Sequence, residues 1–166
     1  MAELNLDPLH WMRPGTLQLS SLPPLTVYIH LPWCLQKCPY CDFNSHAWRD
    51  GDLTQAEQRY TDALLADLDA SLPLIWGRSV QSVFMGGGTP SLFSPESIER
   101  LLSGLRARLR WVADAEVTLE ANPGTFEKDR FRAFRQAGVN RLSIGVQSFY
   151  DRFLKPLGRV HDAAQA

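Results

Sequence analysis

Short stretches of strand-forming residues alternate along the chain with longer stretches that have a helical pattern. Residues 25–31, 80–85, 116–121 and 141–146 are rich in branched and apolar side chains, as expected for buried strands. The segments between them place apolar residues three and four positions apart, which is typical of amphipathic helices. Alternation of this kind predicts an α/β fold with a parallel sheet and right-handed helical crossovers.

Capping residues indicate where the predicted helices begin and end. Thr54 and Glu57 have the spacing of a capping box, in which a hydroxyl and a carboxylate together cap one helix start. Ser94 followed by Pro95 is typical of a second helix start. A third helix, which carries two phenylalanines, is expected to stop at Gly138.

The same pattern divides the chain into a lead-in and one domain. Residues 1–24 have no clear period and are punctuated by proline and glycine, so no function is assigned to them. Residues 25–166 hold four predicted strands but scarcely begin a fourth helix, and four strand–helix units do not close a barrel. We therefore expect a partial (βα) barrel, truncated after its fourth strand, with a C-terminal part of the natural protein missing.

Composition and charge exclude several classes of function. The 166 residues are 45% hydrophobic and 21% charged, which is ordinary for a globular domain. Seventeen basic and eighteen acidic residues give a net charge of -1 without a long run of one sign, so no nucleic-acid partner is expected. Neither a secretory signal nor a membrane span of roughly 20 apolar residues is visible. These features predict a cytoplasmic protein.

The three cysteines of the chain, Cys34, Cys38 and Cys41, lie within eight residues of one another. An odd, clustered set is unsuited to disulfides and favours metal binding in a reducing compartment. This spacing lets one loop present three thiolates to an iron–sulfur cluster, and three ligands for four irons leave one iron open. A zinc site completed by His30 or His46 is the alternative. It is disfavoured because structural zinc loops usually carry a second cysteine pair.

The segment around these cysteines, residues 28–43, resembles the signature of the radical S-adenosylmethionine (SAM) superfamily. Within the superfamily it is similar to the oxygen-independent coproporphyrinogen oxidase family, which includes the heme chaperones of the HemW group. The resemblance extends over nearly everything from Leu25 onward and implies a partial radical SAM barrel. It also implies a 4Fe-4S cluster on the three cysteines, with SAM bound at the open iron.

The resemblance assigns further cofactor contacts to residues that lie on or just after the predicted strands. From its residues alone, the glycine run Gly86 to Gly88 reads as a tight turn, although it also removes every Cβ that would block a ligand. Glu120 could equally be a surface glutamate, and Tyr40 an aromatic shield for the cluster. Arg159 is expected to hold the cofactor carboxylate through a charge-assisted pair. The residues that the resemblance implies as SAM contacts are Tyr28, Tyr40, Gly87, Gly88, Thr89, Glu120, Gln147 and Arg159.

Two functions are compatible with such a site. One is an enzyme that oxidatively decarboxylates a porphyrinogen in porphyrin biosynthesis, and the other is a chaperone that binds heme and transfers it to a client hemoprotein. Members of the oxidase branch carry another cysteine two residues after the third, where this chain has Phe43. The resemblance therefore favours the heme chaperone, without coproporphyrinogen oxidase activity. No catalytic residue, electron donor or heme ligand follows from the sequence, and none of the four histidines is preferred.

Overall fold

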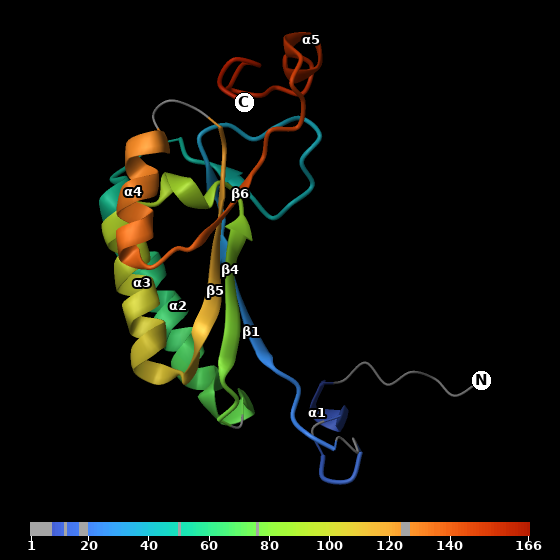
Figure 1. Cartoon of the computed structure of the whole chain (residues 1–166), viewed down its shortest axis with the longest axis vertical. Coiled ribbons are helices and arrows are strands. Elements are labelled where there is room, and N and C mark those ends of the chain that lie inside the picture. The colour runs from blue at the N-terminus through green and yellow to red at the C-terminus, as the bar shows by residue number, and fades with distance from the viewer. Residues whose placement is uncertain (1–7, 12, 17–19, 50, 76, 124–126) are drawn as a thin grey trace, which may run out of the picture.

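The computed structural model describes residues 8–11, 13–16, 20–49, 51–75, 77–123 and 127–166. These residues form a four-stranded sheet with three helices side by side over one of its faces (Figure 1). All strand pairs in this sheet are parallel, and the strand order is β1-β4-β5-β6. The predicted α/β fold with parallel strands is therefore confirmed. Within the described ranges, no helix is both long and apolar enough to cross a membrane.

The strands of the sheet alternate in sequence with the helices that cover it. The sheet strands are β1 (Leu25–Leu31), β4 (Val80–Gly87), β5 (Trp111–Ala121) and β6 (Arg141–Ile144). The covering helices are α2 (Leu53–Ile75), α3 (Pro95–Arg108) and α4 (Glu127–Ala137). The short elements are α1 (Pro8–Trp11), β2 (Trp33–Cys34), β3 (His46–Ala47), the 3-10 helix η1 (Pro90–Leu92) and α5 (Asp151–Leu154).

Three strand ends differ from the predicted bounds, because pairing with a neighbouring strand decides where a strand stops. The second predicted strand continues through Gly87, which pairs with Leu31 of β1. The third begins earlier than predicted, at Trp111, which pairs with Val80 before the register between β4 and β5 shifts. The fourth ends earlier, at Ile144. Gly86 and Gly87, which the sequence alone indicates as part of a tight turn, therefore belong to β4.

The hydrophobic core lies between the sheet and the helices. Met85 of β4 and Leu119 of β5 are completely buried, as are Ile98 and Leu102 of α3 and Phe134 of α4. Burying one such side chain contributes about 1.5–3 kcal/mol relative to leaving it exposed. The core therefore anchors the carboxyl-terminal halves of β4 and β5, from which the glycine run and Glu120 extend.

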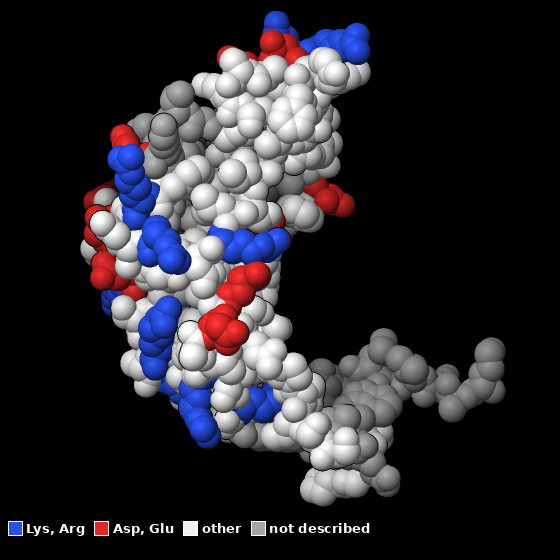
Figure 2. Space-filling view, in the orientation of Figure 1, with Lys and Arg blue, Asp and Glu red and all other residues white. Residues whose placement is uncertain are grey.

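Parallel pairing brings the carboxyl ends of all four strands to one edge of the sheet. The loop that carries the cysteines and the C-terminal segment 145–166 both lie beyond this edge (Figure 1). Figure 2 shows that charged side chains gather over the sheet and helices, whereas the surface beyond the edge is mostly uncharged apart from charged atoms at its tip and acidic atoms on its right flank. The cysteines and the predicted cofactor contacts other than Tyr28 therefore lie at one end of the molecule.

The predicted capping box at the start of α2 is wrong. The helix begins at Leu53, so that Thr54 already lies inside it. The carboxylate of Asp52 accepts a hydrogen bond from the backbone N–H of Gln55 at 3.2 Å, which is the contact of an N-cap residue. Glu57 turns away from its own helix start.

Glu57 caps the neighbouring helix α3 instead. Glu57 is only 2% exposed. Its carboxylate accepts hydrogen bonds from the Ser94 N–H at 3.1 Å and the Ser94 hydroxyl at 2.6 Å. It also accepts from the Ser97 hydroxyl at 2.7 Å, while the Ser97 N–H donates to Ser94 Oγ at 3.2 Å. Ser94 is the N-cap of α3, as the sequence predicts. A carboxylate from α2 thus supplies the second half of the capping box of α3 and joins the two helices.

We expect Glu57→Ala to lower the free energy of unfolding by roughly 3 kcal/mol, because it leaves a partly buried N–H and two partly buried hydroxyls without their charged acceptor. The measurement is urea denaturation followed by circular dichroism. Glu99→Ala, at an exposed position of α3, is the matched control and should change stability by less than about 0.5 kcal/mol. Equal stabilities of the two variants would contradict the assigned role of Glu57.

Candidate functional site

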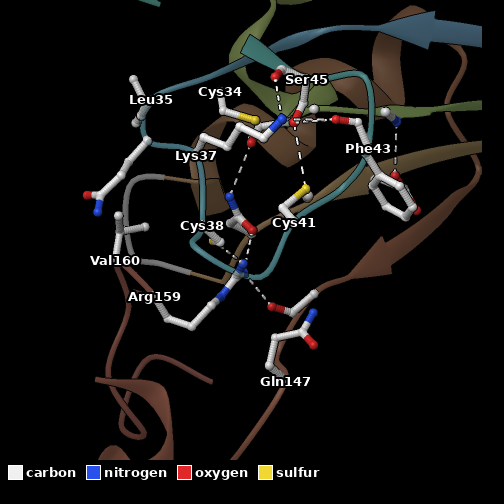
Figure 3. Close-up of a pocket in the computed structure, with 18 of the residues that line it drawn as sticks. Cys34, Leu35, Lys37, Cys38, Cys41, Phe43, Ser45, Gln147, Arg159 and Val160 are labelled. Atoms are coloured by element: carbon white, nitrogen blue, oxygen red, sulfur yellow. Dashed lines mark hydrogen bonds between the residues drawn. The ribbon is translucent and has the colours of Figure 1, made fainter. Parts of the chain in front are cut away.

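A cleft of about 500 Å³ opens at the carboxyl ends of the strands, between the cysteine loop and the C-terminal segment (Figure 3). This size is in the usual range for a site that binds a small molecule. The cleft lining includes all three cysteines and most of the predicted cofactor contacts. Those that line it are Cys34, Cys38, Tyr40, Cys41, Gly87, Gly88, Thr89, Glu120, Gln147 and Arg159.

The cysteine loop is closed at its base by backbone pairing. Strand β2 pairs in parallel with β3, and the His46 N–H donates to the Pro32 carbonyl at 2.8 Å while the Trp48 N–H donates to the Cys34 carbonyl at 2.8 Å. The Lys37 ammonium spans the loop and donates to the carbonyl oxygens of Phe43 and Ser45, both at 3.1 Å. These bonds fix the loop without using any cysteine sulfur.

The three cysteines are free thiols, with Cys34 buried and Cys38 and Cys41 partly exposed. Among the described side chains, no three of histidine, cysteine, aspartate or glutamate are grouped closely enough to hold a single metal ion. In a polynuclear cluster each thiolate binds a different iron, so the sulfurs of such a site do not have to meet at one point. Three thiols around one cleft are therefore compatible with a cluster.

The glycine run is packed so tightly that no side chain fits. A Cβ on Gly87, which has a φ of +118°, would lie 2.6 Å from the His30 ring. A Cβ on Gly88 would lie 2.6 Å from the backbone oxygen of Pro32. The Gly88 N–H donates to the Leu31 carbonyl at 2.8 Å. The absence of side chains here lets the end of β4 approach the base of the cysteine loop, which explains the glycines physically.

Glu120 reaches the glycine run from β5. Its Oε2 accepts a hydrogen bond from the Gly87 N–H at 3.3 Å. Tyr28 lies on β1 outside the cleft lining, where its phenol is hydrogen-bonded to His30 Nδ1 at 3.1 Å. Partial burial raises the pKa of the Tyr28 phenol above its ordinary value, and the negative charge of Glu120 raises it further. The structure thus brings Glu120 into the cleft and leaves Tyr28 beside it.

Arg159 ties three segments of the site together (Figure 3). Its Nη2 donates to Asn122 Oδ1 at 2.6 Å and to the Gly145 carbonyl at 2.7 Å, which follow β5 and β6 respectively. Its Nη1 donates to the sulfur of Cys38 at 3.5 Å. Its buried Nε N–H has no hydrogen-bond partner among the described residues. One guanidinium therefore links two strand ends to the cysteine loop and keeps an unused buried donor.

Gln147 has an unusual backbone conformation. Its φ of +66° is the only positive φ at a non-glycine residue in the described part of the chain. Such a conformation costs on the order of 1–3 kcal/mol and is concentrated at functional sites. The carbonyl of the preceding residue, Val146, accepts a hydrogen bond from Nε2 of the buried His161 at 3.0 Å. The fold thus holds Gln147 in the cleft wall against its local preference.

Tyr40 stands at the mouth of the cleft between the second and third cysteines. It is about half exposed. Partial burial raises the pKa of its phenol above the ordinary value, whereas the positive charge of Arg159 acts in the opposite direction. An aromatic ring in this place is suited to cover a bound planar group or to shield the cysteine sulfurs from water.

Sequence reasoning missed Lys37, Ser45 and Asn122, which all line or brace the cleft. Asn122 could have been found, because it directly follows a predicted strand at the edge where the other site residues gather. Lys37 and Ser45 carry no comparable signal. Their roles depend on how the cysteine loop closes in space.

The sequence of the chain is similar to those of known proteins. The family model of the radical SAM superfamily matches residues 28–166. The chain is 57% identical over 148 residues to the heme chaperone HemW of Escherichia coli, and the match covers 89% of this chain and 38% of that protein. It is 52% identical over 152 residues to the heme chaperone HemW of Haemophilus influenzae, covering 89% of this chain and 39% of that protein. The chain thus spans about two fifths of the length of these relatives.

The solved structures lead to the same family. Coproporphyrinogen III oxidase (HemN) from Escherichia coli, described as a radical SAM enzyme, superposes with a TM-score of 0.74 at 35% sequence identity. That superposition covers 84% of this chain and 31% of the oxidase, so the fold is a partial one relative to the oxidase. The resemblance inferred from the cysteine segment is confirmed by these matches. Because the family model covers most of its length, the chain belongs to the radical SAM superfamily.

Proposed function

We propose that the protein is a heme chaperone of the HemW type, which binds heme and transfers it to client hemoproteins. It holds a 4Fe-4S cluster on Cys34, Cys38 and Cys41 and binds SAM in the cleft. The observation that carries this proposal is the meeting of three free thiols and a side-chain-free glycine run in one cleft, in a chain 57% identical to a HemW protein.

The residues present fit both groups. Three thiols with no disulfide partner are the ligand type that iron–sulfur clusters prefer. Gly87 and Gly88 line the cleft without side chains, and the buried Nε N–H of Arg159 has no acceptor from the described protein. A ligand with a carboxylate satisfies such a donor. A cofactor with a charged amino-acid end therefore suits this cleft.

When bound, a cluster of this type supplies an electron for reductive cleavage of SAM. The chain itself binds and orients the cofactor and excludes water from the site. In the proposed site, the backbone of Gly87 and Gly88 and the side chain of Thr89 face the amino-acid end of SAM, and Glu120 accepts a hydrogen bond from its ammonium group. Tyr40 covers the adenine.

Arg159 has a more specific role in this proposal. A guanidinium has five N–H donors, and three of them already serve Asn122, Gly145 and Cys38. The Nε N–H and one Nη1 N–H remain for the cofactor carboxylate. Gln147, held at a positive φ, contributes an amide to the same wall. Tyr28 lies outside the cleft lining and contributes to the site only through its hydrogen bond to His30.

The heme function has its own support. The relatives named as HemW heme chaperones are similar over 89% of this chain. The resemblance places a further cysteine in the oxidase branch at the position of Phe43, which is an exposed phenylalanine here. The second candidate is a coproporphyrinogen III oxidase, which is supported by the superposition with HemN. We place residues 25–166 in one domain and the protein in the cytoplasm, without a nucleic-acid partner.

Replacement of any one cysteine by alanine is expected to abolish the cluster, because two thiolates cannot retain it. Iron and acid-labile sulfide in the anaerobically reconstituted protein are the quantities to measure. His46→Ala removes an exposed imidazole next to the same loop and should keep both at the level of the unsubstituted protein. If the unsubstituted protein instead contains stoichiometric zinc and no sulfide, and His46→Ala loses the zinc, the cysteines form a zinc site.

Arg159→Lys should weaken SAM binding by roughly 10- to 100-fold, since an ammonium offers three donors and cannot replace a fork that serves four acceptors. Loss of one charge-assisted hydrogen bond has about this size. Equilibrium dialysis with labelled SAM measures the effect. Arg152→Lys, at an exposed position seven residues away, is the control. Similar dissociation constants for both variants would exclude Arg159 from the binding site.

The heme function is tested with the anaerobically reconstituted protein. We expect it to bind heme and to transfer it to an apo-hemoprotein, which then gains the absorption spectrum of its holo form. The same preparation, supplied with coproporphyrinogen, dithionite and SAM, should release no carbon dioxide above background. Decarboxylation at a steady rate, without heme transfer, would favour the oxidase and contradict the chaperone.

A further inference from the structure

The hydroxyl of Ser45 lies beside the sulfur of Cys41. Ser45 follows the cysteine loop, directly before β3, and is only 2% exposed. Its Oγ is 3.7 Å from Cys41 Sγ and 3.4 Å from the carbonyl oxygen of Phe43 (Figure 3). A serine hydroxyl has a single proton to donate, so it can serve only one of these two acceptors fully.

The carbonyl of Phe43 is already occupied by better donors. It accepts from the backbone N–H of Ser45 at 2.7 Å and from the Lys37 ammonium at 3.1 Å. A carbonyl oxygen has two lone pairs, so these two donors fill it. The contact from the Ser45 hydroxyl is a third one and, at 3.4 Å, the longest.

Metal ligation decides the direction of the other contact. Between a thiol and a hydroxyl, either atom can be the donor. A cysteine that binds iron does so as a thiolate, which carries no proton and can only accept. The Ser45 hydroxyl is shielded from water by its burial, so the Cys41 sulfur is the acceptor that remains for its proton.

We propose that Ser45 donates a hydrogen bond to the Cys41 thiolate and thereby raises the reduction potential of the cluster. This inference rests on the proposed 4Fe-4S cluster. The reduced cluster carries one more electron, supplied by an external one-electron reductant, and part of its charge is spread over the sulfur ligands. A donated hydrogen bond stabilises that charge more in the reduced state than in the oxidised state. Ser45 is thus a positioning residue that tunes the cluster through Cys41.

The test is a redox titration of the reconstituted protein without SAM, monitored by electron paramagnetic resonance. Ser45→Ala should shift the equilibrium about tenfold toward the oxidised cluster, which is roughly 59 mV for one electron. An exchangeable proton coupling of the reduced cluster, detected by electron–nuclear double resonance in H₂O and D₂O, should also be lost. Ser143→Ala, which removes a hydroxyl from β6 in the same cleft, should change neither quantity.

A second pair of variants separates the hydroxyl from its packing. Ser45→Thr and Ser45→Val have the same shape, but only threonine keeps the hydroxyl. The threonine variant should have the higher potential and keep the exchangeable coupling, and this comparison decides the matter if Ser45→Ala assembles no cluster. If a cluster is present and the two variants have equal reduction potentials, the proposed role of Ser45 is overturned, but the proposed function is not. Absence of iron and sulfide from the unsubstituted protein would overturn the proposed function and this inference with it.

Discussion

The arrangement of the site depends on parallel strand pairing, which places the carboxyl ends of β1, β4, β5 and β6 at one edge of the sheet. Each strand then delivers one component: the cysteine loop follows β1, the glycine run ends β4, Glu120 lies near the end of β5, and Gln147 follows β6. Position at this edge does not by itself connect these components to one another. The Arg159 guanidinium joins the exits of β5 and β6 to Cys38, and the glycine run allows backbone contact between β4 and the base of the cysteine loop.

Stability and function are concentrated at different places in the molecule. The helix-covered face holds the completely buried aliphatic side chains and the Glu57 carboxylate that joins α2 to α3. The cleft holds a strained backbone at Gln147, three free thiols and, on Arg159, a donor that no described residue satisfies. A rigid packed layer thus supports an edge whose own groups are left partly unsatisfied. Such groups lower stability in the absence of a ligand and favour its binding.

Features encoded in adjacent residues could be predicted from the sequence. The alternation of strands and helices and the Ser94 cap were sufficient to predict the parallel α/β fold, and the cysteine spacing was sufficient to point to the loop that lines the candidate cleft. The individual contacts between distant residues could not be predicted. Glu57 has the local spacing of a capping box, yet its partner Ser94 is 37 residues away on another helix. The positive φ of Gln147 and the closeness of Ser45 to Cys41 likewise depend on packing that no local pattern encodes.

The proposed site requires three thiolates that hold a cluster whose remaining iron is free to bind SAM. Electron paramagnetic resonance of the dithionite-reduced, anaerobically reconstituted protein, recorded before and after addition of SAM, tests it most directly. We expect a 4Fe-4S signal whose g-values shift when SAM is added, because a ligand enters the coordination sphere of one iron. A cluster signal that is unchanged at saturating SAM would contradict it.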